Sequence, residues 1–338
     1  MTSGSAQPSH VRTRQWRGGK TTADDFPLSE LRDRVADADA AVWVDLCAPS
    51  EDDLRLVADV LGLDHVALED AVTHRERTKL DRYTGYLFLN LYAASAAKGR
   101  LALHEVSAFV CDRALVTVRD DDAFDMDGLV RRWDDDLSLW RRGVADEAEN
   151  VRSLLLYGLL DQIVDGQLDA VQALDDETDA VEELVFDDAP QGREIQHRSF
   201  RLRKNLGALR RVALPMREIL STLLRRDTEL VPDSMRPYYQ DVYDHALHVG
   251  EWTDGLRDLV ADLLETRIAL QDNRLNEVMK KVTSWAAIIA VPTAVTGFFG
   301  QNLAFPGRDA SSGFVVSSVV LVVLGVGLYG VFKRNGWL

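Results

Sequence analysis

The chain is short of cysteine: Cys47 and Cys111 are the only two among 338 residues, and they form no Cys-x-x-Cys pair. This scarcity excludes a disulfide-stapled secreted domain and a thiol-based zinc motif, so both cysteines are expected to be reduced and structural. No apolar run follows Met1, so we expect no secretory signal sequence. A phosphate-cradling glycine loop, a His-Glu-x-x-His motif and a convincing nucleophile–base pair are also missing, which argues against an enzyme.

Basic residues are in the minority, because 39 lysines and arginines stand against 55 aspartates and glutamates and leave a formal net charge of −16. No nucleic-acid partner is expected, since such proteins carry a basic stripe. The acidic balance is typical of ordinary solubility charge, and concentrating cations at a surface is the alternative. The seven histidines are scattered, and we interpret His245 and His248 as helix-surface residues rather than metal ligands.

Two stretches near the C-terminus lack formal charge altogether, namely residues 282–299 and 314–332. Each has about the length, roughly 20 residues, that crosses the hydrocarbon layer of a bilayer as a helix. A short polar loop, residues 300–313, separates them. The mean hydropathy of the whole chain is only −0.15, so most of its mass is aqueous. The pattern predicts a helical membrane hairpin on a charged soluble body, with a buried core hairpin as the weaker alternative.

The basic residues that flank these stretches predict their orientation. Lys280 and Lys281 precede the first stretch, Lys333 and Arg334 follow the second, and the loop between them carries Arg308 alone. Basic residues near span ends favour the cytoplasmic side. We therefore expect a multi-pass protein of the cytoplasmic membrane, with both termini and the basic tail at 333–338 inside and the loop outside.

The N-terminal part is expected to be a cytoplasmic α/β domain over residues 21–142. Apolar, strand-like runs occur at 40–46, 86–92, 106–111 and 115–118, and Gly99 marks a turn. Helical patterns occur at 50–61, 64–72 and 122–142. Residues 1–20 are expected to form a flexible tail with a candidate edge strand at 11–16.

Residues 143–232 are expected to form a long antiparallel helical hairpin, with helices at 150–186 and 193–230. Its acidic face between Asp175 and Glu183 is interpreted as solvated surface, and attraction of cations is the alternative. A stalk helix over 233–281 then meets no strong breaker before Pro292. Continued to residue 299, it would span roughly 95 Å at about 1.5 Å per residue. A helix that is half in water and half in lipid needs other helices, and identical copies are the simplest supply.

One face of the first membrane stretch is small or polar. Its members recur at alternating spacings of three and four and are Asn276, Met279, Thr283, Ala286, Ala290, Thr293 and Gly297. Such a row serves close helix packing or faces water. It leads directly into Gly300, Gln301 and Asn302.

The motifs, taken together, resemble the CorA family of divalent-cation channels, within a two-span superfamily that carries a Gly-x-Asn signature. The family's LED…RPKLD-Y segment is matched by LEDAVTHRERTKLDRYTGYLFLNLY at 68–92, and its stalk opening by YYQDVYDHAL at 238–247. Its pore-helix motifs are matched by NEVMK at 276–280 and PTAVTGFFGQN at 292–302. The resemblance covers most of the chain in the family's order, which makes it far more specific than Gly-x-Asn alone.

The resemblance implies a homopentameric funnel with a pore lined by five first membrane helices. By position, Asn302 would form the outer selectivity ring beside Gly300 and Gln301. Neutral amide oxygens suit Mg²⁺, which sheds water reluctantly, because they hydrogen-bond its hydration shell without stripping it.

Further residues take pore roles by the same resemblance. Thr293, Thr283 and Asn276 would form later polar rings along the pore. Met279 and Val282 match the family's apolar constriction, which closes by dewetting.

The resemblance also implies that Mg²⁺ is both the transported and the regulatory ion. Asp70 and Asp241 match an acidic pair that binds Mg²⁺ between neighbouring subunits. Without the ion two such carboxylates at ~4 Å repel by roughly 1–4 kcal/mol, so cytosolic Mg²⁺ is expected to close its own entry route. On residues alone, capping or solvation is the favoured interpretation of each aspartate.

Two departures from the family pattern keep alternatives open. Gln301 stands where the family usually has Met, and Arg308 beside Asp309 weakens cation attraction at the outer mouth. The second feature resembles the ZntB-like branch, which moves zinc. The expected function is passive transport of Mg²⁺, with Co²⁺ and Ni²⁺ as further candidate ions. The alternatives are a Zn²⁺ transporter of the same architecture and a non-conducting metal sensor or scaffold.

Overall fold

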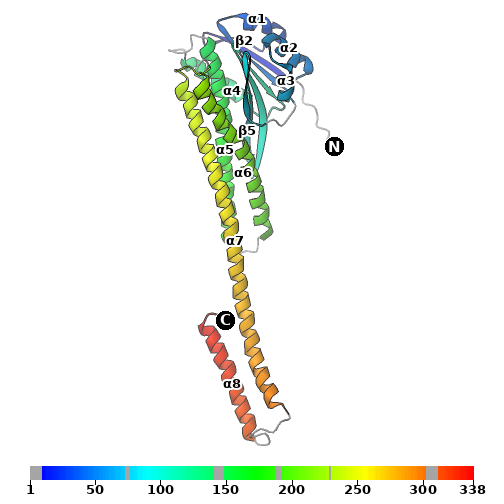
Figure 1. Ribbon diagram of the computed structural model, residues 1–338, viewed down its shortest axis with the longest axis vertical. Coiled ribbons are helices and arrows are strands. Elements are labelled where there is room, and N and C mark those ends of the chain that lie inside the picture. Colours follow the sequence, from blue (N-terminus) through cyan, green and yellow to red (C-terminus); the bar gives the residue numbers. More distant parts are fainter. Residues whose placement is uncertain (1–9, 73–76, 141–147, 188–191, 228–229, 302–310) are drawn as a thin grey trace. The chain divides into compact units, whose positions relative to one another are not determined.

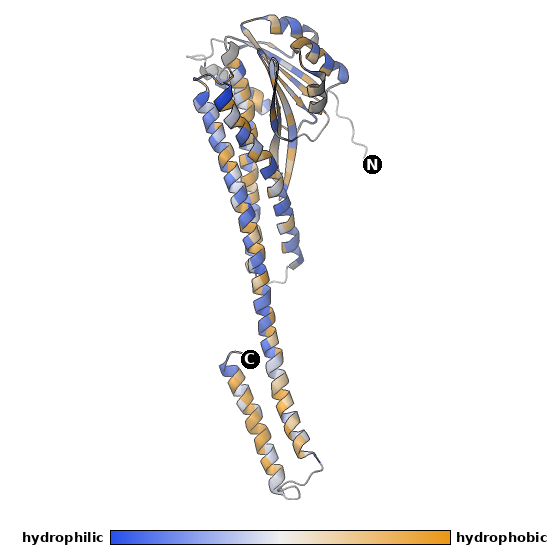
Figure 2. Ribbon diagram, viewed as in Figure 1, coloured by the Kyte–Doolittle hydropathy of each residue, from blue (hydrophilic) through white to orange (hydrophobic). Residues whose placement is uncertain are grey.

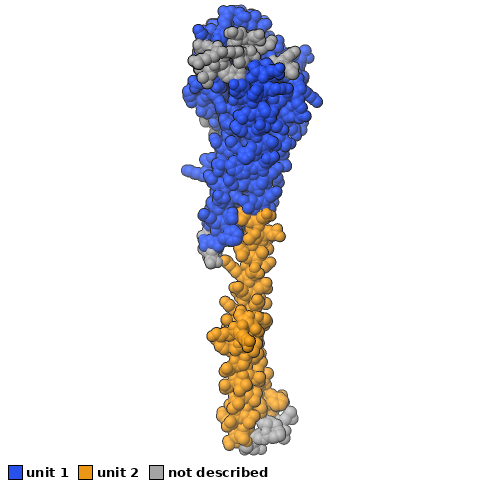
Figure 3. Space-filling model, turned by 90° about the vertical axis from the view of Figure 1, so that its left-hand side faces the viewer, with its two compact units in different colours: residues 1–261 blue, residues 262–338 orange. Residues whose placement is uncertain are grey.

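The computed structural model describes residues 10–72, 77–140, 148–187, 192–227, 230–301 and 311–338. The chain divides into two compact units, residues 1–261 and residues 262–338 (Figure 3). We describe each unit by itself.

A mixed seven-stranded sheet is the centre of the first unit (Figure 1). Its strands lie in the order β2-β1-β3-β7-β6-β5-β4, and β3 and β7 are parallel whereas all other neighbours are antiparallel. All eight residues of β3 and all six of β7 are buried, as expected for strands covered on both faces. The strands are β1 (His10–Arg17), β2 (Lys20–Asp24), β3 (Ala40–Cys47), β4 (Lys79–Tyr83), β5 (Tyr86–Ala97), β6 (Arg100–Cys111) and β7 (Ala114–Arg119).

Short helices cover one face of the sheet. They are η1 (Leu28–Glu30), α1 (Leu31–Ala36), α2 (Glu51–Leu61) and α3 (His65–Val72). Phe88 and Phe109 of the sheet pack towards this side with Leu31 and Val57 of the helices. A reciprocal capping box between Ser50 and Asp53 starts α2, and a left-handed Gly62 ends it.

Long helices cover the other face of the sheet. The strand residues that alternate with the first set have their side chains on this face. They are α4 (Met126–Trp140), α5 (Ala148–Phe186), α6 (Gly192–Arg226) and the beginning of α7 (Arg236–Phe299). Trp133 of α4 fits edge-on against Trp16 and Trp43 of the sheet, and its indole nitrogen donates to the Leu155 carbonyl at 3.1 Å. This aromatic cluster fixes α4 and α5 on the sheet.

The second unit consists of the rest of α7 and of α8 (Ser311–Arg334). Both helices are long and apolar enough to cross a membrane by length and composition, and α8 has no buried residue in the single chain. Figure 2 shows their apolar character over the last part of α7 and over most of α8. The helix α7 is continuous to Phe299, as its lack of breakers predicted, and Pro292 lies inside it.

The structure corrects several expectations for the N-terminal part. Residues 10–17, expected within a flexible tail with an edge strand, form β1, which lies inside the sheet between β2 and β3. The edges are instead β2 and β4, and neither strand was predicted, because both are short and mostly polar. The hairpin of β5 and β6 also extends further than the apolar runs, to a turn at Gly99.

The close approach of α4 and α5 gives a prediction for stability. A methyl group at Gly158 would lie 2.6 Å from the indole nitrogen of Trp133. We expect Gly158→Ala to lower the thermal unfolding midpoint, with a loss of about 1–3 kcal/mol, because the aromatic cluster must shift. Gly207→Ala on α6 is the matched control, since its nearest neighbour would be 3.9 Å away. It should be neutral or stabilising by up to ~1 kcal/mol. Equal midpoints for the two variants would contradict the prediction.

Candidate ion pathway and cytoplasmic acidic cluster

The small and polar row of α7 is exposed along its whole length in the single chain. Every member from Asn276 to Gly297 is exposed. The less exposed side chains recur on the opposite side of the helix and include Ser284, Ile288, Val291, Val295 and Phe299. Val295 and Phe299 line a groove of about 370 Å³ together with Phe314, Ser317 and Leu321 of α8. The row therefore faces away from α8 and has no cover within the second unit.

The hydroxyl groups of this helix donate to its own backbone. Thr293 donates to the Ile289 carbonyl at 2.8 Å, and Thr296 donates to the Thr293 carbonyl at 3.0 Å. A hydroxyl that donates in this way keeps its oxygen lone pairs for another donor, such as the hydration shell of a cation. Thr293 and Thr283 are both exposed in the row, so each can present an oxygen there.

The row ends in a tight turn. The amide of Gly300 donates to the Thr296 carbonyl at 2.9 Å, and the amide of Gln301 donates to the Phe298 carbonyl at 3.3 Å. A methyl group at Gly300 would lie only 3.0 Å from the Thr296 carbonyl oxygen, which favours glycine. Gln301 is exposed, whereas Asn302 lies outside the described residues.

Two apolar side chains stand at the start of the membrane-length part of α7. Met279 is 59% and Val282 is 60% exposed. Met279 belongs to the row and Val282 lies beside it. Apolar groups so exposed on a helix need a partner surface.

The two aspartates of the expected regulatory pair lie on different elements. Asp70 lies in α3, and its side chain is outside the described part of the structure. Asp241 is exposed in the second turn of α7. Burial raises the pKa values of Asp161 and Tyr157 on α5, and the charge of Asp241 adds a smaller contribution in the same direction.

Sequence reasoning missed an acidic cluster close to Asp241. Asp161 and Asp165 of α5 and His245 of α7 hold potential ligand atoms that all lie within 4.8 Å of one another. His245 was interpreted as a surface residue. It is instead half-buried, and its Nδ1 is a buried atom without a hydrogen-bond partner. His248 is exposed, as interpreted, and its ring lies 5.3 Å from that of Trp252.

The charge of this cluster is partly neutralised by an arginine. Arg132 of α4 forms ion pairs with Asp161 and, at 3.1 Å, with Asp165. Burial nevertheless raises the pKa of Asp161 to about 6, and Arg132 opposes that shift. Carboxylate oxygens suit Mg²⁺, whereas a histidine nitrogen favours Zn²⁺, Co²⁺ or Ni²⁺, so the cluster has donors for either class.

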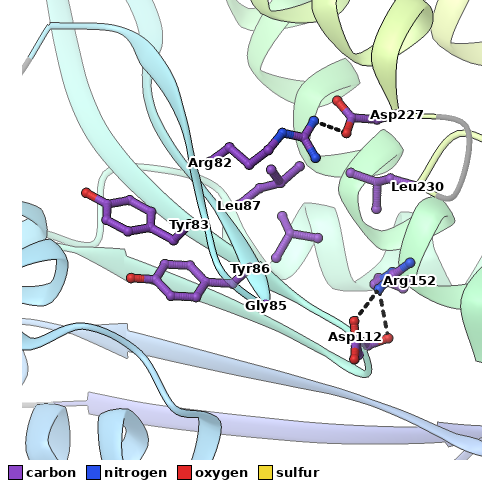
Figure 4. Close-up of a pocket in the computed structure, with 10 residues that line it drawn as sticks. Arg82, Tyr83, Gly85, Tyr86, Leu87, Asp112, Arg152, Asp227 and Leu230 are labelled. Carbon is purple, nitrogen blue, oxygen red and sulfur yellow. Dashed lines mark hydrogen bonds and ion pairs between the residues drawn. The ribbon is translucent and has the colours of Figure 1, made fainter.

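A pocket of about 210 Å³ in the first unit is a separate feature (Figure 4). Its charged groups pair with one another, because Arg82 binds Asp227 and Arg152 lies 3.6 Å from Asp112. None of the predicted site residues lines it. We therefore do not assign it to an ion pathway.

The raised pKa of Asp161 predicts a pH dependence of stability. The folded chain binds this proton more tightly than the unfolded chain, so stability should rise as the pH falls from 7 through about 6 towards 4. The contribution is at most about 3 kcal/mol. Asp161→Asn should flatten this part of the profile, whereas Asp169→Asn, at an exposed position of the same helix, should keep it. Thermal unfolding midpoints of chelator-treated protein across this range check the expectation, and parallel profiles for both variants would contradict it.

Comparison with known proteins places the chain in a family. The sequence model of the family described as "CorA-like Mg2+ transporter protein" matches residues 38–334. The cobalt/magnesium transport protein CorA of Thermotoga maritima is 28% identical over 306 residues, which are 89% of this chain and 85% of that protein. The zinc transport protein ZntB of Pectobacterium carotovorum is 31% identical, but over 144 residues, which are 40% of this chain and 42% of that protein.

Solved structures share the fold. The complete CorA magnesium transporter of Methanocaldococcus jannaschii superposes with a TM-score of 0.74 at 19% identity and covers 97% of this chain and 98% of its own. The full-length CmaX protein superposes with a TM-score of 0.69 at 21% identity and covers 99% and 100%. With the family model matched over nearly the whole length, the chain belongs to the CorA-like Mg²⁺ transporter family.

Proposed function

We propose that the chain assembles as a homopentamer in the cytoplasmic membrane and conducts hydrated divalent cations, Mg²⁺ above all, along a pore lined by α7. The observation that carries this proposal is the exposed row of small and polar side chains on the side of α7 opposite α8. In lipid such a row needs other helices or water. Five copies around an axis supply both, because each row then borders a shared aqueous path.

Selection takes place at the outer end of the row. Asn302, with Gln301 and Gly300, supplies neutral amide oxygens that hydrogen-bond the water shell of the ion. Mg²⁺ keeps its water readily and demands octahedral geometry, so a ring that holds the hydrated ion discriminates by size without a high cost of dehydration. Thr293, Thr283 and Asn276 repeat polar contacts towards the cytoplasm.

Flow is passive and inward. An inside-negative potential of 100 mV contributes about 4.6 kcal/mol for a divalent ion, twice the single-charge value. Met279 and Val282 form an apolar constriction that closes by expelling water. Both termini lie in the cytoplasm, as the basic residues beside the spans indicate.

Cytosolic Mg²⁺ regulates the gate. Asp241 is exposed on α7 and available to an ion shared with Asp70 of a neighbouring copy. The cluster of Asp161, Asp165 and His245 lies nearby, because His245 follows Asp241 by one helical turn on α7. The charge of Asp241 also helps to raise the pKa of Asp161. Ions bound there neutralise carboxylates that otherwise repel, which stabilises the closed arrangement.

Two alternatives remain distinct from this proposal. A Zn²⁺ transporter is favoured by the ZntB relative, by Arg308 beside Asp309 in the outer loop and by the histidine of the acidic cluster. The row from residue 276 to 301 holds no cysteine or histidine, which disfavours direct zinc coordination there. A non-conducting sensor or scaffold would bind ions at the cluster without flux. Uptake of Mg²⁺, Co²⁺ and Zn²⁺ into proteoliposomes, with and without a proton gradient, separates the three.

Asn302→Ala tests the selectivity ring. We expect uptake of Mg²⁺ into proteoliposomes to fall by more than about tenfold, because five amides are lost from the ring at once. Asn335→Ala is the matched control, since it makes the same change at an exposed position near the C-terminus. Undiminished uptake by an intact oligomer of the Asn302 variant would refute the assignment.

Asp241→Lys tests regulation. A lysine at this position places its own positive charge where the ion would bind, so it should decouple gating from cytosolic Mg²⁺. The Mg²⁺ concentration for half-inhibition should then change by about tenfold, in line with a carboxylate repulsion of roughly 1–4 kcal/mol. Asp244→Lys changes a neighbouring exposed aspartate of α7 and should leave the inhibition curve in place. Superimposable curves for parent and Asp241 variant would remove Asp241 from the regulatory site.

A further inference from the structure

The hairpin of α5 and α6 carries opposite charges on two exposed faces. An acidic stripe on α5 consists of Asp169, Asp176, Asp179 and Glu183, all exposed and all on one face by their spacing of three, four and seven. A basic stripe on α6 consists of Arg193, His197, Arg201, Lys204 and Arg211, which are exposed with the same kind of spacing.

The two stripes face different sides of the first unit. The helices α5 and α6 contact each other through Glu177 and Arg198, at 2.9 Å. Each also contacts α7, through the Arg210–Asp254 pair at 2.6 Å and through the Tyr239 hydroxyl, which donates to the Ser153 carbonyl of α5 at 2.9 Å. In three helices that contact one another pairwise, the outward faces point in different directions. The acidic stripe therefore cannot reach the basic stripe of its own chain.

Most charges of both stripes are unpaired within the chain. Over the described residues no ion pair joins an acid of the acidic stripe to any base, and Arg201 reaches Glu177 only at 3.8 Å. Acids that share one helix face repel one another. Each stripe thus gains from an opposite charge that another molecule brings.

The levels of the two stripes match. The Glu177–Arg198 pair fixes the register of the antiparallel hairpin. At about 1.5 Å per residue along both helices, Glu183 then lies level with Arg193, Asp179 with His197 and Asp176 with Arg201. Rotation about an axis along the helices keeps every residue at its level, so these pairs would meet between copies in a ring.

Exposed phenylalanines accompany the charges. Phe200 of α6 is 71% exposed between His197 and Arg201, and Phe186 of α5 is 58% exposed beyond Glu183. Aromatic anchors within a polar rim are typical of protein interfaces, whereas a face that stays in water gains nothing from exposed aromatic rings. Free cations would neutralise only the acidic stripe, and anionic lipids would neutralise only the basic stripe. Neither would cover the two phenylalanines.

We propose that the acidic stripe of one copy docks on the basic stripe of the next copy, head to tail. This interface rests on the proposed homo-oligomer and specifies a contact within it. Complementary stripes on one chain generate a heterologous contact, which forms a ring when the rotation between successive copies closes, as the proposed homopentamer requires. A two-fold contact between identical stripes would set like charges against each other.

Charge reversal in the full-length protein tests the interface. The acidic variant is Asp176→Arg with Glu183→Arg, the basic variant is Arg193→Glu with Arg201→Glu, and the combined variant carries all four changes. Asp52→Arg with Asp59→Arg, at exposed positions of α2, is the control for the acidic variant. Native mass spectrometry in detergent at low ionic strength measures the fraction assembled upon dilution.

We expect each reversal to raise the concentration for half-dissociation by about tenfold or more and the control to leave it unchanged. The combined variant should return to the value of the parent, and added salt should shrink the differences, as for exposed charges. Restoration by the combined variant cannot result from misfolding of the single reversals.

Four outcomes would overturn the interface. If the parent assembles and neither reversal changes the concentration for half-dissociation, the interface is refuted but the oligomer is not. A combined variant no better than the worse reversal refutes the pairing of stripes. A reversal that changes Mg²⁺ inhibition but not assembly identifies the acidic stripe as a cation-attracting face instead. A parent chain that stays monomeric refutes the proposed oligomer together with its interface.

Discussion

The absence of hydrogen-bond partners in lipid is the constraint on which the arrangement of the chain depends. Two helices satisfy their own backbone, but the polar row of α7 still has to meet water or another helix. The helix α8 does not cover it, because α8 shares a groove with the other side of α7. The row therefore has no cover in the second unit of a single chain, and the proposed homo-oligomer would enclose it.

In the first unit, exposed charged side chains supply the surface that the proposed neighbouring copy would cover. Along α5, the first turns bury Leu154 and Leu155 against the sheet, the middle places Asp161 beside Arg132 and His245, and the end exposes the acidic stripe. One helix therefore carries part of the aromatic core, two acids of the candidate ion-binding cluster and the surface proposed to dock on another copy. Asp241 and His245 lie on α7, the helix that also carries the polar row.

Long patterns were predictable from the sequence and short ones were not. The uncharged runs gave α8 and the end of α7, and the buried strands β3 and β7 followed from continuous apolar residues. Strands β2 and β4 escaped notice because edge strands are short and polar. The acidic cluster escaped because spacing reveals the neighbours of Asp161 on α5 but not that His245 of a distant helix meets it. The roles of Asn302 and Asp70 came from the family resemblance, and both stay predictions.

Back-bonding of the hydroxyls in α7 has a consequence for biogenesis. Ser284, Thr293 and Thr296 each donate to a carbonyl of their own helix, so their protons are satisfied before any partner arrives. In a single hairpin within a bilayer, these three hydroxyl protons would therefore not be left without an acceptor, although the rest of the row would still lack cover. The proposed oligomer would then form by lateral encounter of hairpins already in the membrane, at a rate set by the number of copies there.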